Sequence, residues 1–404
     1  MVALDEFFSI QAKLVKRISG LQRRFLAETI DWNRRLLGIT GARGTGKTTL
    51  LLQHLASVDR GDQRYLYISA DHIRVQAIGL YETAAYFFRL GGKAVLIDEI
   101  HKYADWSQEV KNLYDAFPDA KIWLSGSSTL ALQKAKGDLS RRIVFENLPA
   151  LSFREYLYFS GGKKFEPISL SNLLNHHARL ASRILEEGPV LGHFKNYLTH
   201  GVYPYFLEST DDYFPKLLNV MEKVLYEDIP TVTGMKSLNV PVLKRILWLV
   251  ATSEPFTPNI ERMSRNLKIS KEYIYTYLDF LDRAGLLSGF LPSETGYRMV
   301  RKAAKIYLEN TNLLKALTGE IGTEGRVGTV RETFFAHQLK SAGQDVRIPK
   351  QGDFLINGKV AFEIGGRGKK KSQIESIENA FLIRDEIEVG YANVIPLWLF
   401  GFLY

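Results

Sequence analysis

In the first 150 positions, short apolar runs alternate with longer stretches whose apolar residues recur every three to four positions. The longer stretches have the period of one helical face, and the first predicted helix covers residues 12–30. The short runs predict strands at residues 35–40, 65–69, 93–98, 121–125 and 143–145. Strands that alternate with helices are typical of a parallel sheet covered on both faces. We therefore expect an α/β domain over residues 1–150, with the fourth strand between the first and the third.

The pattern changes after residue 150. Residues 151–239 have mainly helical spacing interrupted by glycines, which predicts a helical connector or lid. Residues 240–328 contain three helical stretches and then two β-like runs, the order found in a winged helix. Residues 329–404 begin with a helix, continue with strands at 345–348, 353–356 and 359–364, and then with a helix from about residue 373 and a final strand. This last part predicts a small α/β domain.

Composition narrows the function classes. The 404 residues include no cysteine, which excludes disulfides, thiolate zinc sites and a thiol nucleophile. The formal charge of +9 favours a polyanionic ligand or partner, although a solvated basic surface explains it equally well. Asp5 and Glu6 stand where a signal peptide would be basic, and apolar runs such as residues 397–404 are too short to span a bilayer. We expect a soluble cytoplasmic protein with no membrane partner.

Residues 41–48 match the pattern G-x-x-x-x-G-K-[ST], between a predicted strand and a predicted helix. Glycines allow the tight curl that points backbone N–H groups at phosphates, and the next helix aims its positive end at them. Lys47 would reach the β- and γ-phosphates, and the Thr48 hydroxyl would bind Mg²⁺. The alternative is a chance glycine-rich turn. The expected nucleotide-binding residues are Gly41, Ala42, Arg43, Gly44, Thr45, Gly46, Lys47, Thr48 and Thr49.

An independent signal is the apolar strand that ends in Asp98 and Glu99. Carboxylates at this position lie beside the P-loop at the sheet's carboxyl edge. Asp98 would hold Mg²⁺ through water, and Glu99 would act as general base toward the attacking water. The alternative is two solvated acids in a turn.

Further polar residues follow the fourth and precede the fifth strand. Ser125 and Ser127 are candidates to contact the γ-phosphate or the water, and a plain strand-to-helix cap explains either serine nearly as well. Arg142, beside Arg141, is a candidate to reach a phosphate in cis or across a subunit interface, with a surface pair as the equal alternative.

Five segments carry a family resemblance: 41–49, 96–102 with Trp106, 124–128, 148–155 and 395–400. With them the chain resembles prokaryotic AAA+ ATPases in which a winged helix and a C-terminal domain of unknown function follow the AAA domain. The resemblance implies ATP and Mg²⁺ as ligands, an oligomeric state that is open, and the following roles. Lys47 would bind phosphate, and Thr48 and Asp98 would bind the metal. Glu99 would orient the water, and Ser125 or Ser127 would be the sensor serine. Arg142 would be the arginine that reaches a phosphate.

The predicted winged helix offers basic and aromatic residues to double-stranded DNA. These residues are Lys271, Tyr273, Tyr275, Arg283, Arg298, Arg301 and Lys302. The alternative is a lid or a surface for a protein partner, with Tyr273 and Tyr277 in the core.

The last domain resembles a restriction-endonuclease-like fold, with Glu332 on a helix, Asp353 at a strand start and Glu363 at a strand end. The resemblance makes Asp353 and Glu363 a candidate second metal site. Gly365 stands where that fold has its lysine, so either Lys369 or a neighbour substitutes, or the fold is degenerate and only binds. The histidines have no metal-ligand spacing and are interpreted as ordinary residues.

These observations predict an ATPase whose nucleotide state controls a winged helix and a nuclease-like module, on DNA or a protein partner. Two alternatives stay open: a slow nucleotide-switched regulatory or defence module, and a DNA nuclease controlled by ATP.

Overall fold

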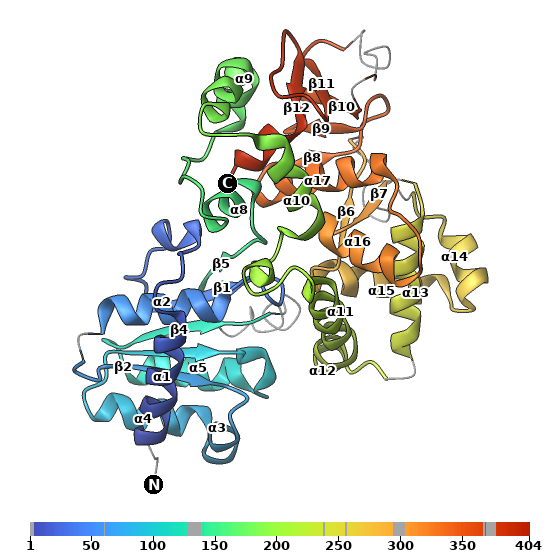
Figure 1. Cartoon of the computed structure of the whole chain (residues 1–404). Helices are drawn as coiled ribbons and strands as arrows, with labels where there is room; N and C mark the ends of the chain where they lie inside the picture. Colours follow the sequence, from blue (N-terminus) through green and yellow to red (C-terminus); the bar gives the residue numbers. More distant parts are fainter. Residues whose placement is uncertain are drawn as a thin grey trace. The chain divides into compact units, whose positions relative to one another are not determined.

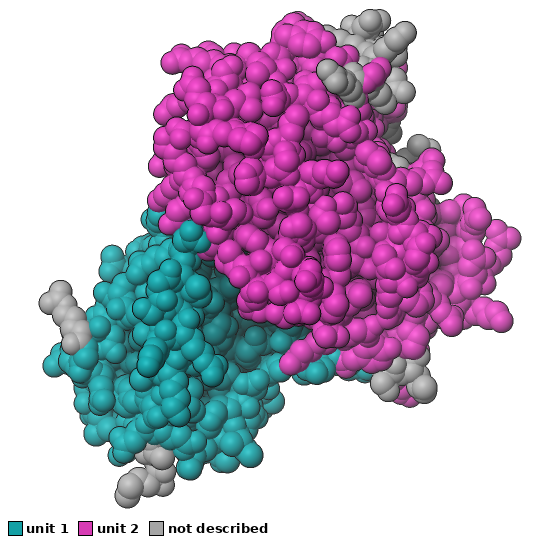
Figure 2. Space-filling model, in the orientation of Figure 1, with its two compact units in different colours: residues 1–150, 227–235 teal, residues 151–226, 236–404 magenta. Residues whose placement is uncertain are grey.

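The computed structural model describes residues 4–59, 61–127, 139, 141–236, 239–254, 257–293, 304–366, 368 and 377–404. The chain divides into two compact units (Figure 2). Residues 1–150 and 227–235 form the first unit, and residues 151–226 and 236–404 form the second. The segment 227–235 therefore belongs to the first unit, although the chain on both sides of it belongs to the second. The sequence did not predict this return, and the finer division of the second unit into domains stays a prediction.

The first unit is built on a five-stranded parallel sheet (Figure 1). Its strands are β1 (Leu36–Thr40), β2 (Tyr65–Ser69), β3 (Ala94–Asp98), β4 (Lys121–Ser125) and β5 (Val144–Asn147). Their order is β2-β3-β4-β1-β5, so the fourth strand lies between the first and the third. The predicted α/β sheet is confirmed. All five strands point the same way, which brings their carboxyl ends to one edge.

Helices cover both faces of this sheet because successive strand residues point to opposite sides. Leu66 and Ile68 pack into one apolar core, with α4 and α5, while Tyr67 packs into the other, with α2. The elements are α1 (Leu4–Ile18), η1 (Phe25–Glu28), α2 (Lys47–Val58), α3 (Ile73–Ile78), α4 (Leu80–Arg89), η2 (Ile100–Lys102), α5 (Trp106–Ala116) and α12 (Ile229–Thr233). The prediction of one helix over 12–30 is wrong, because α1 ends at Ile18 and Gly20 follows with φ of 82°.

Strand β2 lies at an edge of the sheet, and a side chain from α1 satisfies part of its open side. Gln11 donates from Nε2 to the carbonyl of Tyr65 at 3.1 Å and accepts from the amide of Tyr67 at 2.8 Å. Gln11 is itself buried, so both halves of its amide have partners. This pairing fixes α1 against the sheet and closes an edge that would otherwise be open to another strand.

The second unit starts with α8 (Phe153–Phe159), which has a capping box at its start. Ser152 accepts from the amide of Glu155, and the Glu155 side chain accepts from the amide of Ser152. Further helices are α9 (Leu170–Leu185), α10 (Val190–His200), η3 (Pro204–Leu207), α11 (Tyr213–Lys223), α16 (Thr311–Glu320) and α17 (Val327–Ser341). The π-helical turn η4 (Val224–Asp228) carries the chain into the first unit.

Residues 240–308 follow the predicted order of three helices and a hairpin. They form α13 (Val240–Thr252), α14 (Ile260–Leu267), α15 (Lys271–Arg283) and the antiparallel pair β6 (Leu287–Phe290) and β7 (Lys305–Leu308). Tyr277 is buried, whereas Tyr273 and Tyr275 are exposed. Lys271 pairs with Glu261, and Arg283 pairs with Asp279. The remaining predicted basic residues, Arg298, Arg301 and Lys302, lie outside the described residues.

A mixed five-stranded sheet of order β12-β11-β10-β9-β8 ends the second unit. Its strands are β8 (Val346–Arg347), β9 (Phe354–Ile356), β10 (Val360–Gly365), β11 (Ala380–Arg384) and β12 (Val394–Pro396). The chain ends not in a strand but in the buried turn η7 (Leu397–Phe402). The predicted helix start near Gln373, and Lys369, lie outside the described residues. Among the described residues, no helix has both the length and the apolar character needed to span a bilayer.

We expect Gln11→Ala to speed amide hydrogen exchange in β2 and to cost about 1–3 kcal/mol of local stability, because the buried amide of Tyr67 loses its acceptor. Hydrogen–deuterium exchange of the full chain measures this. Lys13→Ala, on an exposed position of the same helix, is the matched control and should leave exchange in β2 unchanged. Equal exchange in both variants would contradict the role given to Gln11.

Candidate nucleotide-binding site

The P-loop runs from the end of β1 to the start of α2, as the sequence predicted. Gly41, Gly44 and Gly46 have φ values of 144°, 87° and 95°, which only glycine adopts without strain. A Cβ on Gly41 would lie 2.3 Å from the carbonyl oxygen of Leu148, at the end of β5. The close approach of β5 therefore requires glycine at position 41, independently of any ligand.

Buried side chains support the loop from behind. The buried guanidinium of Arg24 donates to the carbonyls of Thr45 at 2.5 Å and of Pro149 at 2.7 Å. Thr45 Oγ1 donates to the carbonyl of Ala42 at 2.9 Å. These bonds are made within the protein, so they hold the loop's curvature without a ligand. Thr49 lies on the first turn of α2 and is half-buried.

Lys47 lies inside the loop and is buried. Its ammonium donates to the carbonyls of Gly41 at 2.9 Å and of Ala42 at 2.8 Å. Burial lowers the pKa of Lys47 to about 8, although the charges of Glu99 and Asp98 oppose the shift. A desolvated ammonium near this loop is a strong partner for a phosphate, because bulk water does not screen it.

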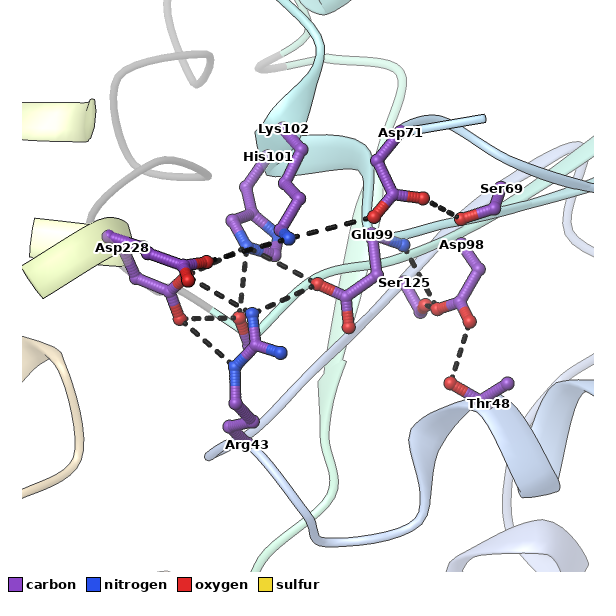
Figure 3. Close-up of polar contacts among 12 residues, drawn as sticks. Arg43, Thr48, Ser69, Asp71, Asp98, Glu99, His101, Lys102, Ser125 and Asp228 are labelled. Carbon is purple, nitrogen blue, oxygen red and sulfur yellow. Dashed lines mark hydrogen bonds and ion pairs between the residues drawn. The ribbon is translucent and has the colours of Figure 1, made fainter. Parts of the chain in front are cut away.

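Asp98, at the end of β3, is the centre of the site. Its Oδ2 accepts from Thr48 Oγ1 at 2.6 Å and from the Tyr67 hydroxyl at 2.9 Å, and its Oδ1 accepts from Ser125 Oγ. Burial and the neighbouring Asp98 raise the pKa of Tyr67, which keeps its proton for this bond. Three hydroxyl groups from α2, β2 and β4 thus meet on one buried carboxylate. Figure 3 shows Thr48 and Ser125 beside Asp98.

Glu99 faces a second cluster beside Asp98, since its backbone has φ of 51° and turns the chain. Its Oε2 lies 3.5 Å from Arg43 Nη2 and 3.4 Å from His101 Nε2. Asp228 binds the same partners: its carboxylate is 3.1 Å and 3.3 Å from Arg43 and 3.7 Å from His101. Ser127 Oγ lies 3.1 Å from His101 and 3.3 Å from Asp228. Figure 3 shows how Arg43, His101, Glu99 and Asp228 converge.

The acidic pair and both serines therefore lie at one edge of the sheet, but in separate clusters. Ser125 contacts Asp98, whereas Ser127 contacts His101 and Asp228. Which serine senses a nucleotide stays a prediction.

The structure does not bring Arg142 to this edge. Arg142 donates to the two carboxylate oxygens of Asp115, at 3.2 Å each. It precedes β5, which runs parallel to β1, so it lies at the amino ends of the strands, while the P-loop lies at their carboxyl ends. A contact with a phosphate in cis is therefore excluded by strand direction, and a role across a subunit interface stays a prediction.

The sequence reasoning missed three members of the site. Tyr67 lies in the strand predicted at residues 65–69, to which no role in the site was assigned. His101 was interpreted as an ordinary residue, although it follows the acidic pair closely and is almost fully buried. Asp228 was assigned to a distant connector, and no local pattern marks it, because its partner Arg43 is 185 positions away.

A separate acidic cluster lies in the second unit. Glu332 comes from α17, Asp353 precedes β9, and Glu363 is fully buried in β10. Lys305 of β7 places its ammonium 3.3 Å from Glu332 and 3.6 Å from Asp353. Burial and the charge of Asp353 raise the pKa of Glu332. Gly365 lies in β10, paired with Arg384.

This cluster fits an internal ion pair better than a metal. Within the described residues, no group of three or more His, Cys, Asp or Glu side chains has a metal-binding arrangement. The ammonium of Lys305 lies 3.6 Å from Asp353, and the metal site at Asp353 and Glu363 stays a prediction.

Comparison with known proteins adds the family context. Residues 33–157 match the model of an AAA domain, and residues 191–324 match a domain of unknown function (DUF8612). An uncharacterized protein of Methanocaldococcus jannaschii is 29% identical over 437 residues, which covers 96% of this chain and 91% of that protein. A second uncharacterized protein of the same organism is 26% identical over 309 residues, covering 74% of this chain and 65% of that protein.

Among solved structures, a Walker-type ATPase of Pyrococcus abyssi has 13% identity and a TM-score of 0.40, covering 70% of this chain and 91% of that one. The match of the AAA domain spans the P-loop, Asp98 and Glu99. The first unit contains an AAA-like P-loop ATPase domain. The P-loop of this domain and the carboxylates beside it are the expected place of a nucleoside triphosphate.

We expect Gly41→Ala to weaken ATP binding by about tenfold or more, because the new Cβ strains the loop and collides with the carbonyl of Leu148. Binding of a fluorescent ATP analogue, followed by anisotropy, measures the effect. Gly192→Ala is the control, since a Cβ there meets nothing within 4 Å. ATP affinity in Gly41→Ala equal to that of the control would contradict the close approach of β5.

We expect Lys305→Met to lower the stability of the second unit by about 1–3 kcal/mol, because Glu332 and Asp353 lose the cation between them. Urea denaturation followed by tryptophan fluorescence measures the change. Lys359→Met, on an exposed position of the same unit, should change stability by less than about 0.5 kcal/mol. A Lys305→Met protein as stable as this control would show that the ion pair contributes little.

Proposed function

We propose that this protein binds ATP with Mg²⁺ at the P-loop and hydrolyses it, and that its nucleotide state controls the second unit. One observation carries the proposal: the Thr48 hydroxyl and the Asp98 carboxylate lie 2.6 Å apart at the edge that also holds Lys47 and Glu99. The AAA-domain match over residues 33–157 supports ATP as the nucleotide.

The donor set fits magnesium. Thr48 and Asp98 supply hard oxygen atoms, and Asp98 is fixed by Tyr67 and Ser125. A bound Mg²⁺ would neutralise charge on the phosphates. The backbone N–H groups of the P-loop would bind the β- and γ-phosphate oxygens, and Lys47 would turn its ammonium from the loop carbonyls toward them.

Glu99 is the residue suited to position the attacking water. Its side chain is 22% exposed, so water reaches it, whereas Asp98 is buried beneath it. Its contacts with Arg43 and His101 fix the carboxylate without enclosing it. In this mechanism Glu99 accepts a hydrogen bond from the water, which attacks the γ-phosphorus in line with the leaving β-phosphate oxygen.

For the second unit we propose a winged helix over residues 240–328 and a binding module over residues 329–404. The order α13, α14, α15, β6 and β7 supports the winged helix, and exposed Tyr273 and Tyr275 support a contact with double-stranded DNA or a protein. The ion pairs of Lys271 and Arg283 with acids of their own surface reduce the charge available to DNA. The position of Lys305 between two carboxylates favours binding over DNA cleavage.

We expect Glu99→Gln to reduce steady-state phosphate release from Mg-ATP by about a hundredfold while ATP affinity stays within about threefold. The amide keeps the shape of the side chain but does not accept a proton from water. Phosphate release measured beside direct ATP binding tests binding and hydrolysis. The same measurement with and without duplex DNA tests whether the second unit couples hydrolysis to DNA. Lys47→Ala is the control for binding, and its affinity should fall. Equal, slow release by the wild type and Glu99→Gln, with ATP retained, would instead favour the slow nucleotide-switched module.

A further inference from the structure

Asp228 is the member of the site that comes from outside the ATPase sequence. It belongs to the segment 227–235, which lies in the first unit between stretches of the second. Its carboxylate is 6% exposed and binds Arg43 through two atoms. Neither the P-loop pattern nor the acidic pair accounts for such a residue. We propose that Asp228 is a positioning residue of the ATPase site, which limits how closely Arg43 pairs with Glu99 and makes the docking of segment 227–235 depend on the bound nucleotide.

The partners of Asp228 explain the positioning role. Arg43 belongs to the P-loop, His101 to the turn after β3, and Ser127 to the loop after β4. One carboxylate therefore contacts residues of three neighbouring loops at the carboxyl edge of the sheet. Figure 3 shows Asp228 with two of these partners, Arg43 and His101. A buried carboxylate is costly unless it is paired and hydrogen-bonded, so these loops are stable in this arrangement only together.

The distances indicate how Asp228 protects Glu99. Arg43 is 3.1 Å and 3.3 Å from Asp228 but 3.5 Å from Glu99. A guanidinium that binds one carboxylate through two atoms has less freedom to bind a second one in the same way. Without the charge of Asp228, Arg43 would pair fully with Glu99. That pairing would occupy the carboxylate oxygens that the water needs.

The same contact links the nucleotide to the segment. Arg43 lies within the P-loop, where phosphate oxygens compete with Asp228 for its guanidinium. The linkage is reciprocal: a nucleotide that draws Arg43 away weakens the docking of segment 227–235, and a displaced segment frees Arg43 for the nucleotide. The segment starts at the end of the π-helical turn η4, a type of turn that occurs often at functional sites. This inference rests on the proposed ATPase function.

The test compares Asp228→Asn with Glu227→Gln in the 404-residue chain. Asn keeps the shape of the Asp228 side chain and removes its charge. Glu227, the control position, is 55% exposed, and its ion pair with Lys102 is long, at 3.9 Å. We expect kcat for ATP hydrolysis to fall about tenfold or more in Asp228→Asn, with KM within about threefold. Glu227→Gln should keep kcat within about twofold. Normal kcat in Asp228→Asn would overturn the positioning role.

A double variant separates positioning from a general structural effect. If Arg43 inhibits Glu99 once Asp228 has lost its charge, then Arg43→Gln combined with Asp228→Asn should have the kcat of Arg43→Gln alone. Independent, multiplying losses in the double variant would overturn the proposed mechanism.

Hydrogen–deuterium exchange tests the linkage directly. In the wild type, exchange within residues 227–235 should rise when a non-hydrolysable ATP analogue binds, and in Asp228→Asn it should be fast with and without the analogue. Unchanged exchange in the wild type on saturation would overturn the linkage. Failure of the wild type to bind ATP would instead overturn the proposed function itself. If the wild type binds ATP but does not hydrolyse it, the exchange within residues 227–235 decides the role of Asp228.

Discussion

The site depends on a single buried carboxylate. Asp98 stands at the end of an entirely apolar strand, where an unpaired charge would be strongly unfavourable. Hydroxyl groups of Thr48, Tyr67 and Ser125 satisfy it, and each belongs to a different element of the sheet or the P-loop helix. The need to satisfy this one group therefore aligns the ends of three neighbouring strands and the first turn of α2. The positions of Lys47 and Glu99 follow from that alignment.

Local and periodic features of this unit were predictable from the sequence. The P-loop spacing, the five strands and the order that puts β4 beside β1 follow from runs of apolar residues and glycines a few positions apart. Asp98 and Glu99 were found because they end such a run. The direction of β5 also carried information that was not used: two residues before a parallel strand, Arg142 had to lie at the amino edge.

What the sequence did not reveal depends on residues brought together by folding. No sequence pattern marks His101 as a site residue. Its place in the site is defined by its contacts with Glu99, Ser127 and Asp228. Lys305 likewise lies in a hairpin strand, far in sequence from Glu332 and Asp353, and only the structure places its ammonium between them.

The return of segment 227–235 to the first unit has a consequence for how the protein is made. Residues 1–150 emerge before Asp228 during synthesis, and they contain the whole sheet of this unit and the P-loop. Asp228 follows only after a further stretch of the chain. Until then Arg43 has Glu99 as its acidic neighbour at this edge, and the loops after β3 and β4 lack their shared contact. The nascent sheet therefore forms before its nucleotide edge is complete. For the same reason, no single cut in the chain yields an N-terminal fragment that contains the intact first unit without part of the second.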